Sequence, residues 1–96
     1  MSSNEIYGYA KPNYQIISAP QVNYPLIKKG SRNNYVKIAQ QKLIAKGCDC
    51  GRWGADGIFG NDTYSAVIKF QKKAFPNEPK EWDGIIGTKT WAKLLA

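Results

Sequence analysis

The sequence DGIFGNDT at residues 56–63 is followed, at an offset of 27 positions, by DGIIGTKT at residues 83–90. Asp, Gly, Ile, Gly and Thr occupy the same five positions of both segments. A repeat of this kind indicates that one structural unit is used twice in the fold. The repeat therefore decides how the rest of the chain is interpreted.

Each copy of the repeat predicts a tight turn followed by the start of a helix. An Asp-Gly pair favours a turn, because the carboxylate accepts nearby backbone N–H groups and glycine adopts positive φ. The polar residues after the second Gly are expected to supply the N-cap of the helix. The residues of this structural loop motif are Asp56, Gly57, Gly60 and Thr63 in the first copy and Asp83, Gly84, Gly87 and Thr90 in the second.

Apolar residues recur at helical spacing after both copies and in one earlier segment. These positions are Val36, Ala39 and Leu43, then Ala66, Val67, Phe70 and Ala74, then Trp91, Leu94 and Leu95. Gly47 lies where a helix C-terminal cap is expected. The spacing predicts helices over residues 31–46, 61–74 and 88–95, and the first two share a pattern in which Gln40 matches Gln71.

The motifs occur together in an order that resembles the peptidoglycan-binding-like domain family. They are Val-x-x-Ala-Gln-x-x-Leu at residues 36–43, the two repeats, and the helical residues after each, and the resemblance spans residues 24–95. The family is a three-helix module found beside cell-wall hydrolases such as bacteriophage endolysins and bacterial amidases. The resemblance implies an all-α fold, a small three-helix bundle with two Asp-Gly-x-x-Gly loops. The connection at residues 75–82 is longer than is usual in the family.

The chain divides into an irregular N-terminal arm or linker at residues 1–25 and the domain at residues 26–96. The arm holds four of the six tyrosines and three of the five prolines and has no helical period. Two interpretations of the arm remain open. In the first, it is a linker that once joined a catalytic domain. In the second, its tyrosines dock on the domain or on a second copy of the chain. A short strand at residues 15–17 is limited by flanking prolines.

The formal charge of +7 is concentrated in the domain, because residues 1–27 carry only Glu5 and Lys11. A basic domain attracts polyanions, although solvated lysines are also an ordinary helix surface. The phosphate-rich teichoic acids of a Gram-positive envelope are the polyanion that fits a wall-binding domain. Nucleic acid is disfavoured, since Arg32 and Arg52 are the only arginines and no nucleic-acid motif is present.

Catalysis is disfavoured by composition. The chain contains no His, the commonest general base and zinc ligand. Asp56 and Asp83 could form a carboxylate pair, but closing their own turns explains both. Cys48 and Cys50 are too close for an unstrained disulfide and do not complete a zinc site; Cys48 is expected to be buried and Cys50 to lie in a loop, where exposure would allow oxidative dimerisation. We therefore expect a binding module with no catalytic residue, metal or cofactor.

Candidate ligand-binding residues are aromatic, basic or apolar side chains outside the predicted core. Aromatic rings stack on sugar faces and Arg pairs with the carboxylates of wall stem peptides. On the middle helix, the predicted core stripe leaves Tyr64 and Ile68 on a second face, and we assign Gln71 and Phe75 to the same face. Core filling is the alternative for the tryptophans and is favoured for Trp91. The candidates are Arg52, Trp53, Phe59, Tyr64, Ile68 and Trp82.

Two functions remain open. The resemblance implies a peptidoglycan-binding module that targets a cell-wall hydrolase, related to phage endolysins. The alternative is a protein–protein adaptor or separately translated subunit that associates with a full-length lysin or a phage structural protein. No apolar run is long enough for a membrane span and no signal peptide is visible. We therefore expect a location at the cell wall or outside the cell, reached by phage lysis or as part of a longer chain.

Overall fold

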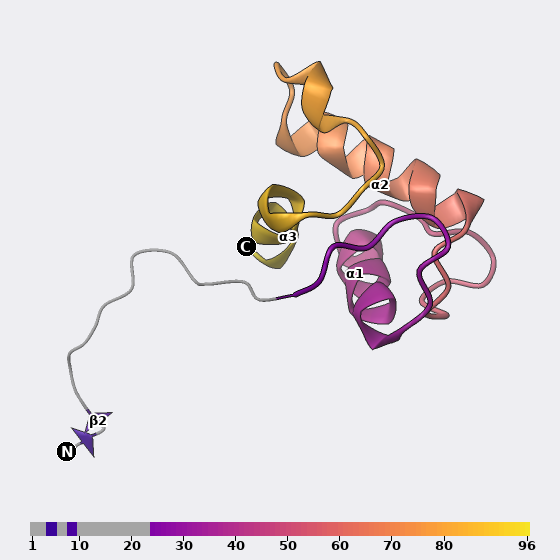
Figure 1. The fold of residues 1–96 in the computed structure, drawn as a ribbon. Helices are drawn as coiled ribbons and strands as arrows, with labels where there is room; N and C mark the ends of the chain where they lie inside the picture. The colour runs from indigo at the N-terminus through magenta and orange to yellow at the C-terminus, as the bar shows by residue number, and fades with distance from the viewer. Residues whose placement is uncertain (1–3, 6–7, 10–23) are drawn as a thin grey trace.

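The computed structural model describes residues 4–5, 8–9 and 24–96 (Figure 1). The elements, in chain order, are β1 (Asn4–Glu5), β2 (Gly8–Tyr9), α1 (Asn34–Ala45), α2 (Asn61–Ala74), the 3-10 helix η1 (Pro79–Glu81) and α3 (Thr88–Leu95). The two short strands pair antiparallel. From residue 24 onward the described chain is a three-helix bundle, so the predicted all-α fold is confirmed. The strand considered at residues 15–17 lies outside the described residues.

The helices α2 and α3 have the predicted bounds, whereas the predicted start of α1 is wrong. The helix begins at Asn34, three residues later than residue 31. Asn33 is the N-cap, and its Oδ1 accepts the backbone N–H of Val36 at 3.0 Å. Arg32 instead forms an isolated β-bridge with Ile58. Residues 31–33 are therefore held in extended contact with the first Asp-Gly loop, and the helix begins only after them.

The core lies where α1 meets α2 and α3, and Trp91 of α3 is completely buried in it. The indole Nε1 of Trp91 donates to the carbonyl of Pro25 at 2.9 Å. The ring of Tyr24 packs edge-on against Trp91, with 4.8 Å between ring centroids. The other large buried side chains are Ile27, Leu43, Phe59, Val67, Phe70, Ile86 and Leu94. Tyr24 and Pro25 are therefore packed against the buried indole of α3.

Both Asp-Gly loops hydrogen-bond to the same segment before α1. Ile27 and Ile86 exchange backbone hydrogen bonds of 3.1 and 2.9 Å. Phe59, which corresponds to Ile86 in the repeat, accepts from Gly30 at 3.0 Å and donates to Ser31 at 2.9 Å. In Figure 1 this violet segment runs from the loop before α3 to the loop before α2. It therefore fixes the two loops side by side.

No helix in the part of the chain that the structure describes combines the length and the apolar character needed to cross a membrane.

Candidate functional site

The first Asp-Gly loop is held by a buried amide from α1. The Nε2 of Gln40 donates to Asp56 Oδ1 at 3.1 Å, to the Ile58 carbonyl at 3.0 Å and to Thr63 Oγ1 at 2.9 Å. Its Oε1 accepts the Gly57 N–H at 2.8 Å. One side chain thus bonds to the Asp-Gly turn, to the Ile58 carbonyl and to Thr63 in the first turn of α2.

The second loop is held in the same way by a buried amide from α2. The Nε2 of Gln71 donates to Asp83 Oδ1 at 3.1 Å, to the Ile85 carbonyl at 3.0 Å and to Thr90 Oγ1 at 3.2 Å. Its Oε1 accepts the Gly84 N–H at 2.9 Å. The repeated unit is therefore a helix with its glutamine, the loop that follows, and the first turn of the next helix.

Two sequence predictions are corrected by these contacts. Gln71 and Phe75 were assigned to a second face of α2, but their exposed fractions are 0% and 4%. An amide on an apolar face is stable when its donors and acceptor are paired, and here all are. The N-caps of α2 and α3 are Gly60 and Gly87, without a side-chain cap. The threonines expected near the caps accept hydrogen bonds from the glutamines instead.

Each repeated aspartate also bonds within its own loop. Asp56 Oδ1 accepts the Ile58 N–H at 3.0 Å, and Asp83 Oδ1 accepts the Ile85 N–H at 3.0 Å. The Ile58 N–H and then the Gln40 amide hold the pKa of the Asp56 carboxyl below its usual value. Because one oxygen serves the loop, the exposed carboxylate of Asp56 still presents its other oxygen to solvent.

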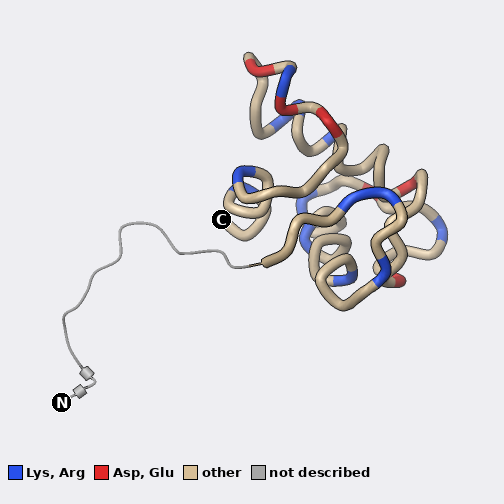
Figure 2. The backbone as a smooth tube through the Cα atoms, in the orientation of Figure 1, with Lys and Arg blue, Asp and Glu red and all other residues tan. Residues whose placement is uncertain are grey.

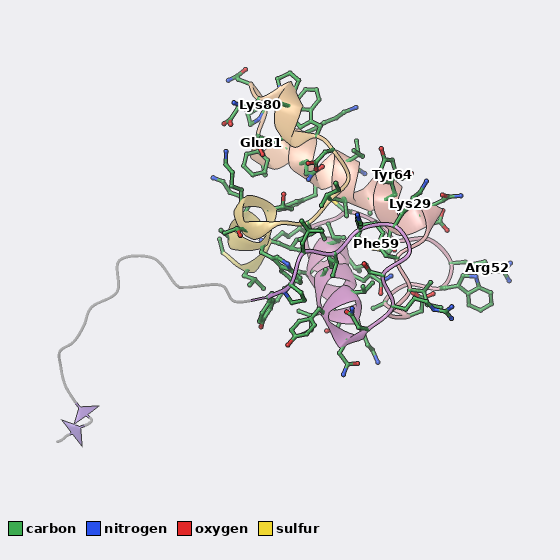
Figure 3. The ribbon with its side chains drawn as sticks, in the orientation of Figure 1. Lys29, Arg52, Phe59, Tyr64, Lys80 and Glu81 are labelled. Carbon is green, nitrogen blue, oxygen red and sulfur yellow. The ribbon has the colours of Figure 1, made fainter. Side chains whose placement is uncertain are left out.

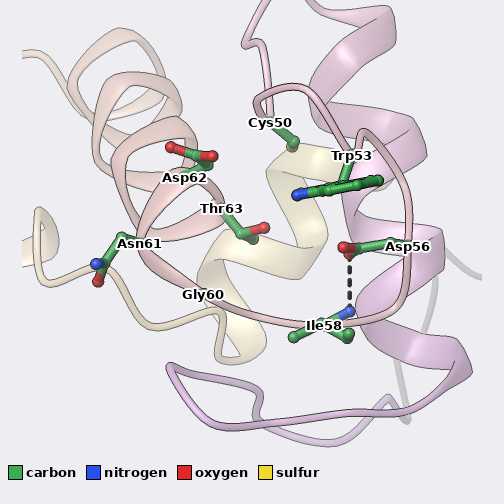
Figure 4. Close-up of a pocket in the computed structure, with 8 residues that line it drawn as sticks. All are labelled: Cys50, Trp53, Asp56, Ile58, Gly60, Asn61, Asp62 and Thr63. Carbon is green, nitrogen blue, oxygen red and sulfur yellow. Dashed lines mark hydrogen bonds between the residues drawn. The ribbon is translucent and has the colours of Figure 1, made fainter.

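The first loop borders a hollow of about 530 Å³, which we call the Trp53 hollow. Figure 4 shows Trp53 and Asp56 on one side, Asn61 and Asp62 on the other, and Thr63 between them. The remaining lining residues are Cys50, Ile58 and Gly60. The side chain of Trp53 is 70% exposed, and the guanidinium of Arg52 lies 4.9 Å from its ring centroid. The hollow thus combines an exposed aromatic ring with two carboxylates.

The second loop borders a smaller hollow of about 290 Å³, which we call the Leu26 hollow. Its lining residues are Leu26, Glu81, Asp83, Ile85, Gly87, Thr88, Lys89 and Thr90. Six of these, from Asp83 to Thr90, occupy the repeat positions that line the Trp53 hollow. This second hollow was not predicted from the sequence, although the repeat itself was the signal for it.

Comparison with known families identifies the domain. Residues 32–94 match the family described as "Putative peptidoglycan binding domain". The chain belongs to this family. The matched region is thus a peptidoglycan-binding domain and not a catalytic one.

Curated relatives carry this peptidoglycan-binding domain within much longer chains. The chain is 39% identical over 71 residues to "Probable N-acetylmuramoyl-L-alanine amidase" of Bacillus licheniformis and 41% identical over 71 residues to the amidase CwlL of the same organism. Each match covers 74% of this chain and 19% of the relative. The type VI secretion system spike protein VgrG3 of Vibrio cholerae is 32% identical over 91 residues, covering 88% of this chain and 9% of that protein. The chain thus spans less than a fifth of these relatives.

Two solved structures share the fold. One is a peptidoglycan-binding protein from Clostridioides difficile in complex with glutamine hydroxamate, with a TM-score of 0.63 and 43% identity. The match covers 73% of this chain and 40% of that one. The other is the SleB N-terminal domain, with a TM-score of 0.63 and 33% identity over 74% of this chain and 89% of that one. These similarities agree with the family assignment.

Of the predicted ligand residues, only Trp53 lines the first hollow, and Arg52 lies over the Trp53 ring without lining the hollow itself. Phe59 is 1% exposed and belongs to the core, so its ring offers no surface to a ligand. Figure 3 shows Phe59 inside the bundle and Arg52 at its edge. Phe59 was listed among the candidate ligand residues, but the backbone of Phe59 is hydrogen-bonded to Gly30 and Ser31 and its side chain is buried.

The remaining candidates lie elsewhere on α2 and in the loop after it. Tyr64 is exposed, but a Cβ added at Gly84 would overlap its ring, so Tyr64 also covers the second loop. The Lys29 ammonium lies 4.9 Å from the centroid of the same ring (Figure 3). Ile68 is half-buried. Trp82 is half-buried, and its Nε1 donates to the Phe75 carbonyl at 2.9 Å.

Both cysteines are buried and free. The burial expected of Cys48 is confirmed, whereas the exposure considered for Cys50 is wrong. Burial, followed by the nearby charge of Asp49, raises the pKa of the Cys50 thiol to about 11. The thiol therefore stays protonated at neutral pH. Among the residues that the structure describes, no three His, Cys, Asp or Glu side chains are grouped as metal ligands would be.

Proposed function

We propose that the domain binds peptidoglycan in the Trp53 hollow and carries out no chemistry of its own. The observation that carries this proposal is the Trp53 ring, which is 70% exposed at the rim of a hollow of about 530 Å³. An exposed indole can stack on the apolar face of a sugar ring. Asp56 and Asp62 add acceptors for sugar hydroxyl or amide groups.

The domain then acts as a tether for a cell-wall hydrolase. Two curated relatives are amidases in which the matching region is 19% of the length. A tether raises the effective concentration of an enzyme on an insoluble substrate. The absence of His from the chain also supports a binding role without catalysis. We place this function at the cell wall, in a protein related to phage endolysins.

The charge of the domain supports a contribution from anionic wall polymers. Residues 24–96 hold 13 of the 14 basic residues and 6 of the 7 acidic ones. Between side chains of residues 24–96, Lys89 is the one of these cations that pairs with an acidic group. Such a surface attracts polyanions at a range set by the screening length, about 8 Å at physiological ionic strength. Teichoic acid is the wall polyanion that we propose as a secondary partner.

A second candidate function is attachment to another protein through the N-terminal arm. The similarity to the spike protein VgrG3 covers 88% of this chain. Residues 24–96 are 73 of the 96 residues, so that match must extend into the first 23. This favours a role of the arm in joining the domain to a lysin or to a phage structural protein. An adaptor of this kind need not bind the wall.

The test is co-sedimentation with purified sacculi, prepared with and without teichoic acid. The wild-type chain should sediment with both, and the fraction bound to walls that carry teichoic acid should fall as salt is added. Trp53→Ala should lose binding while its melting temperature is unchanged. Ile44→Ala, which removes another exposed apolar side chain, from α1, is the control and should bind normally.

Failure of the wild type to sediment would contradict wall binding and favour the adaptor. Full binding by Trp53→Ala would remove the Trp53 hollow from the proposal. Salt-independent binding to both kinds of sacculi would remove the teichoic acid contribution alone.

A further inference from the structure

The two hollows are built on the same framework but are lined differently. In the first, Trp53 supplies an aromatic face. The second has no aromatic lining residue, and the apolar contribution comes from Leu26, whose side chain is 59% exposed, and from Ile85. A sugar ring stacks well on an indole and poorly on a branched aliphatic chain. The hollows are therefore suited to chemically different ligands.

The charges at one equivalent position also differ. Asp62 in the first hollow corresponds to Lys89 in the second. Lys89 Nζ lies 2.9 Å from Glu81 Oε2, and Asp83 lies on the same lining. The charged residues that line the first hollow are thus both acidic, whereas the lining of the second also includes an ammonium group.

Acidic side chains are concentrated at these two places in an otherwise basic domain. All six acidic residues of the segment 24–96 lie within residues 49–62 and 78–83 (Figure 2). Four of them line the two hollows. The Lys89–Glu81 pair is partly exposed, and exposed ion pairs contribute little stability. Both of its groups can therefore exchange their partner for a charged ligand.

A short peptide with small apolar side chains matches the Leu26 hollow. Its methyl groups can contact Leu26 and Ile85, its amide N–H or ammonium groups can donate to Asp83 and Glu81, and its carboxylate can pair with Lys89. The stem peptides of peptidoglycan carry all of these groups. We infer that the Leu26 hollow is a second binding site, for the stem peptide, while the Trp53 hollow takes the sugar; this inference rests on the proposed function.

The distance between the loops allows both hollows to act on one wall fragment. The second loop is bonded to Ile27 and the first to Ser31. Four residues of extended chain span at most about 14 Å, so these two attachment points are no farther apart than that. Both loops are thus fixed to one short segment, and a glycan strand and its own stem peptide can reach the two sites together.

The test is an NMR titration of the full ¹⁵N-labelled chain with two separate probes. One probe is a linear oligomer of N-acetylglucosamine, and the other is a synthetic stem tetrapeptide. The peptide should shift the backbone amide signals of Ile85, Thr88 and Lys89. The sugar should shift those of Ile58 and Asn61. Each probe should leave the signals of the other hollow unchanged.

Variants assign each probe to its hollow. Leu26→Ser and Lys89→Ala should each raise the Kd of the peptide roughly tenfold without changing that of the sugar. Trp53→Ala should raise the Kd of the sugar roughly tenfold without changing that of the peptide. Lys93→Ala removes an exposed ammonium one helical turn beyond Lys89, outside the hollow, and should alter neither affinity.

The outcomes separate this inference from the proposed function. Peptide-induced shifts around Trp53, or no peptide-induced shifts in a chain that binds sacculi, would overturn the inference and leave wall binding intact. Peptide binding at the Leu26 hollow by a chain that fails to bind sacculi would support the peptide site and contradict the tether. A loss of peptide affinity in Lys93→Ala equal to that in Lys89→Ala would reduce the effect to general charge and overturn the site.

Discussion

Replacing Gln40 with Leu tests whether the buried amide holds the first loop. Leu has a similar volume, so the change removes the hydrogen bonds while largely filling the space. The neighbouring Gln41 is exposed on the same helix. Gln41→Leu is therefore a matched control with the same chemistry and the same change in helix propensity.

The expected cost follows from the polar contacts of 2.8 to 3.1 Å that Gln40 makes: its two Nε2 hydrogens are shared by three acceptors, and its Oε1 accepts one N–H, which amounts to about three hydrogen bonds. Each contributes about 1 kcal/mol net, and a buried group left unpaired costs about 1–3 kcal/mol. Water can replace the amide at exposed Asp56 but not at buried Thr63. We therefore expect the free energy of unfolding to fall by about 3 kcal/mol. For a domain of this size, that lowers the melting temperature by roughly 12–24 °C.

The measurement is thermal and urea unfolding followed by circular dichroism. Gln41→Leu should melt close to the wild type. Gln71→Leu should lose about as much stability as Gln40→Leu, because its contacts match those of Gln40 bond for bond. If Gln40→Leu melts within about 2 °C of Gln41→Leu, a shift well below 1 kcal/mol, the amide does not hold the loop and the reasoning is refuted.

Two further predictions concern the loops. Because the pKa of Asp56 is lower in the folded state, its carboxylate stabilises the fold at pH values above the unfolded pKa of about 3.9. This stabilisation is lost as the pH falls through the folded pKa. The difference in melting temperature between wild type and Asp56→Asn should therefore narrow on acidification, and a constant difference would contradict it. Gly84→Ala should lower the urea midpoint more than Gly47→Ala: both have positive φ, but only at Gly84 would the Cβ overlap a ring, that of Tyr64. Equal midpoints would exclude the overlap.

Local sequence determined most of the helical fold. The spacing of apolar residues gave the bounds of α2 and α3 as the structure has them. Helical periodicity is a property of neighbouring residues, so it can be recognised without the rest of the chain. The two Asp-Gly loops were recognised for the same reason, since a turn depends on two or three adjacent residues.

The start of α1 depended on a contact that adjacent residues do not reveal. Residues 31–33 could continue a helix, but Arg32 bridges to Ile58 and Asn33 N–H donates to the Gly57 carbonyl at 3.1 Å. These partners lie more than 20 positions away in the sequence. The extended conformation of the segment is therefore decided by the first loop and not by its own composition.

Burial of individual side chains was also decided by tertiary structure. Gln71 and Phe75 were assigned to an exposed face and Phe59 to a ligand site, yet all three are buried. The partners of the Gln40 amide lie 16 to 23 residues away, so spacing within the helix cannot show that it is paired. The matching positions of Gln40 and Gln71 were the one sequence signal of this role.

The candidate site was predictable only in part. The sequence singled out Trp53, because an aromatic residue in the loop before the Asp-Gly turn is a local feature, and Trp53 lines the first hollow. It did not predict the Leu26 hollow, whose lining joins Leu26 to residues 81–90. That junction exists because Ile27 and Ile86 pair across nearly 60 residues of chain. The sequence by itself determined the repeated unit, and the pairing of both loops with one segment determined that each unit carries a hollow.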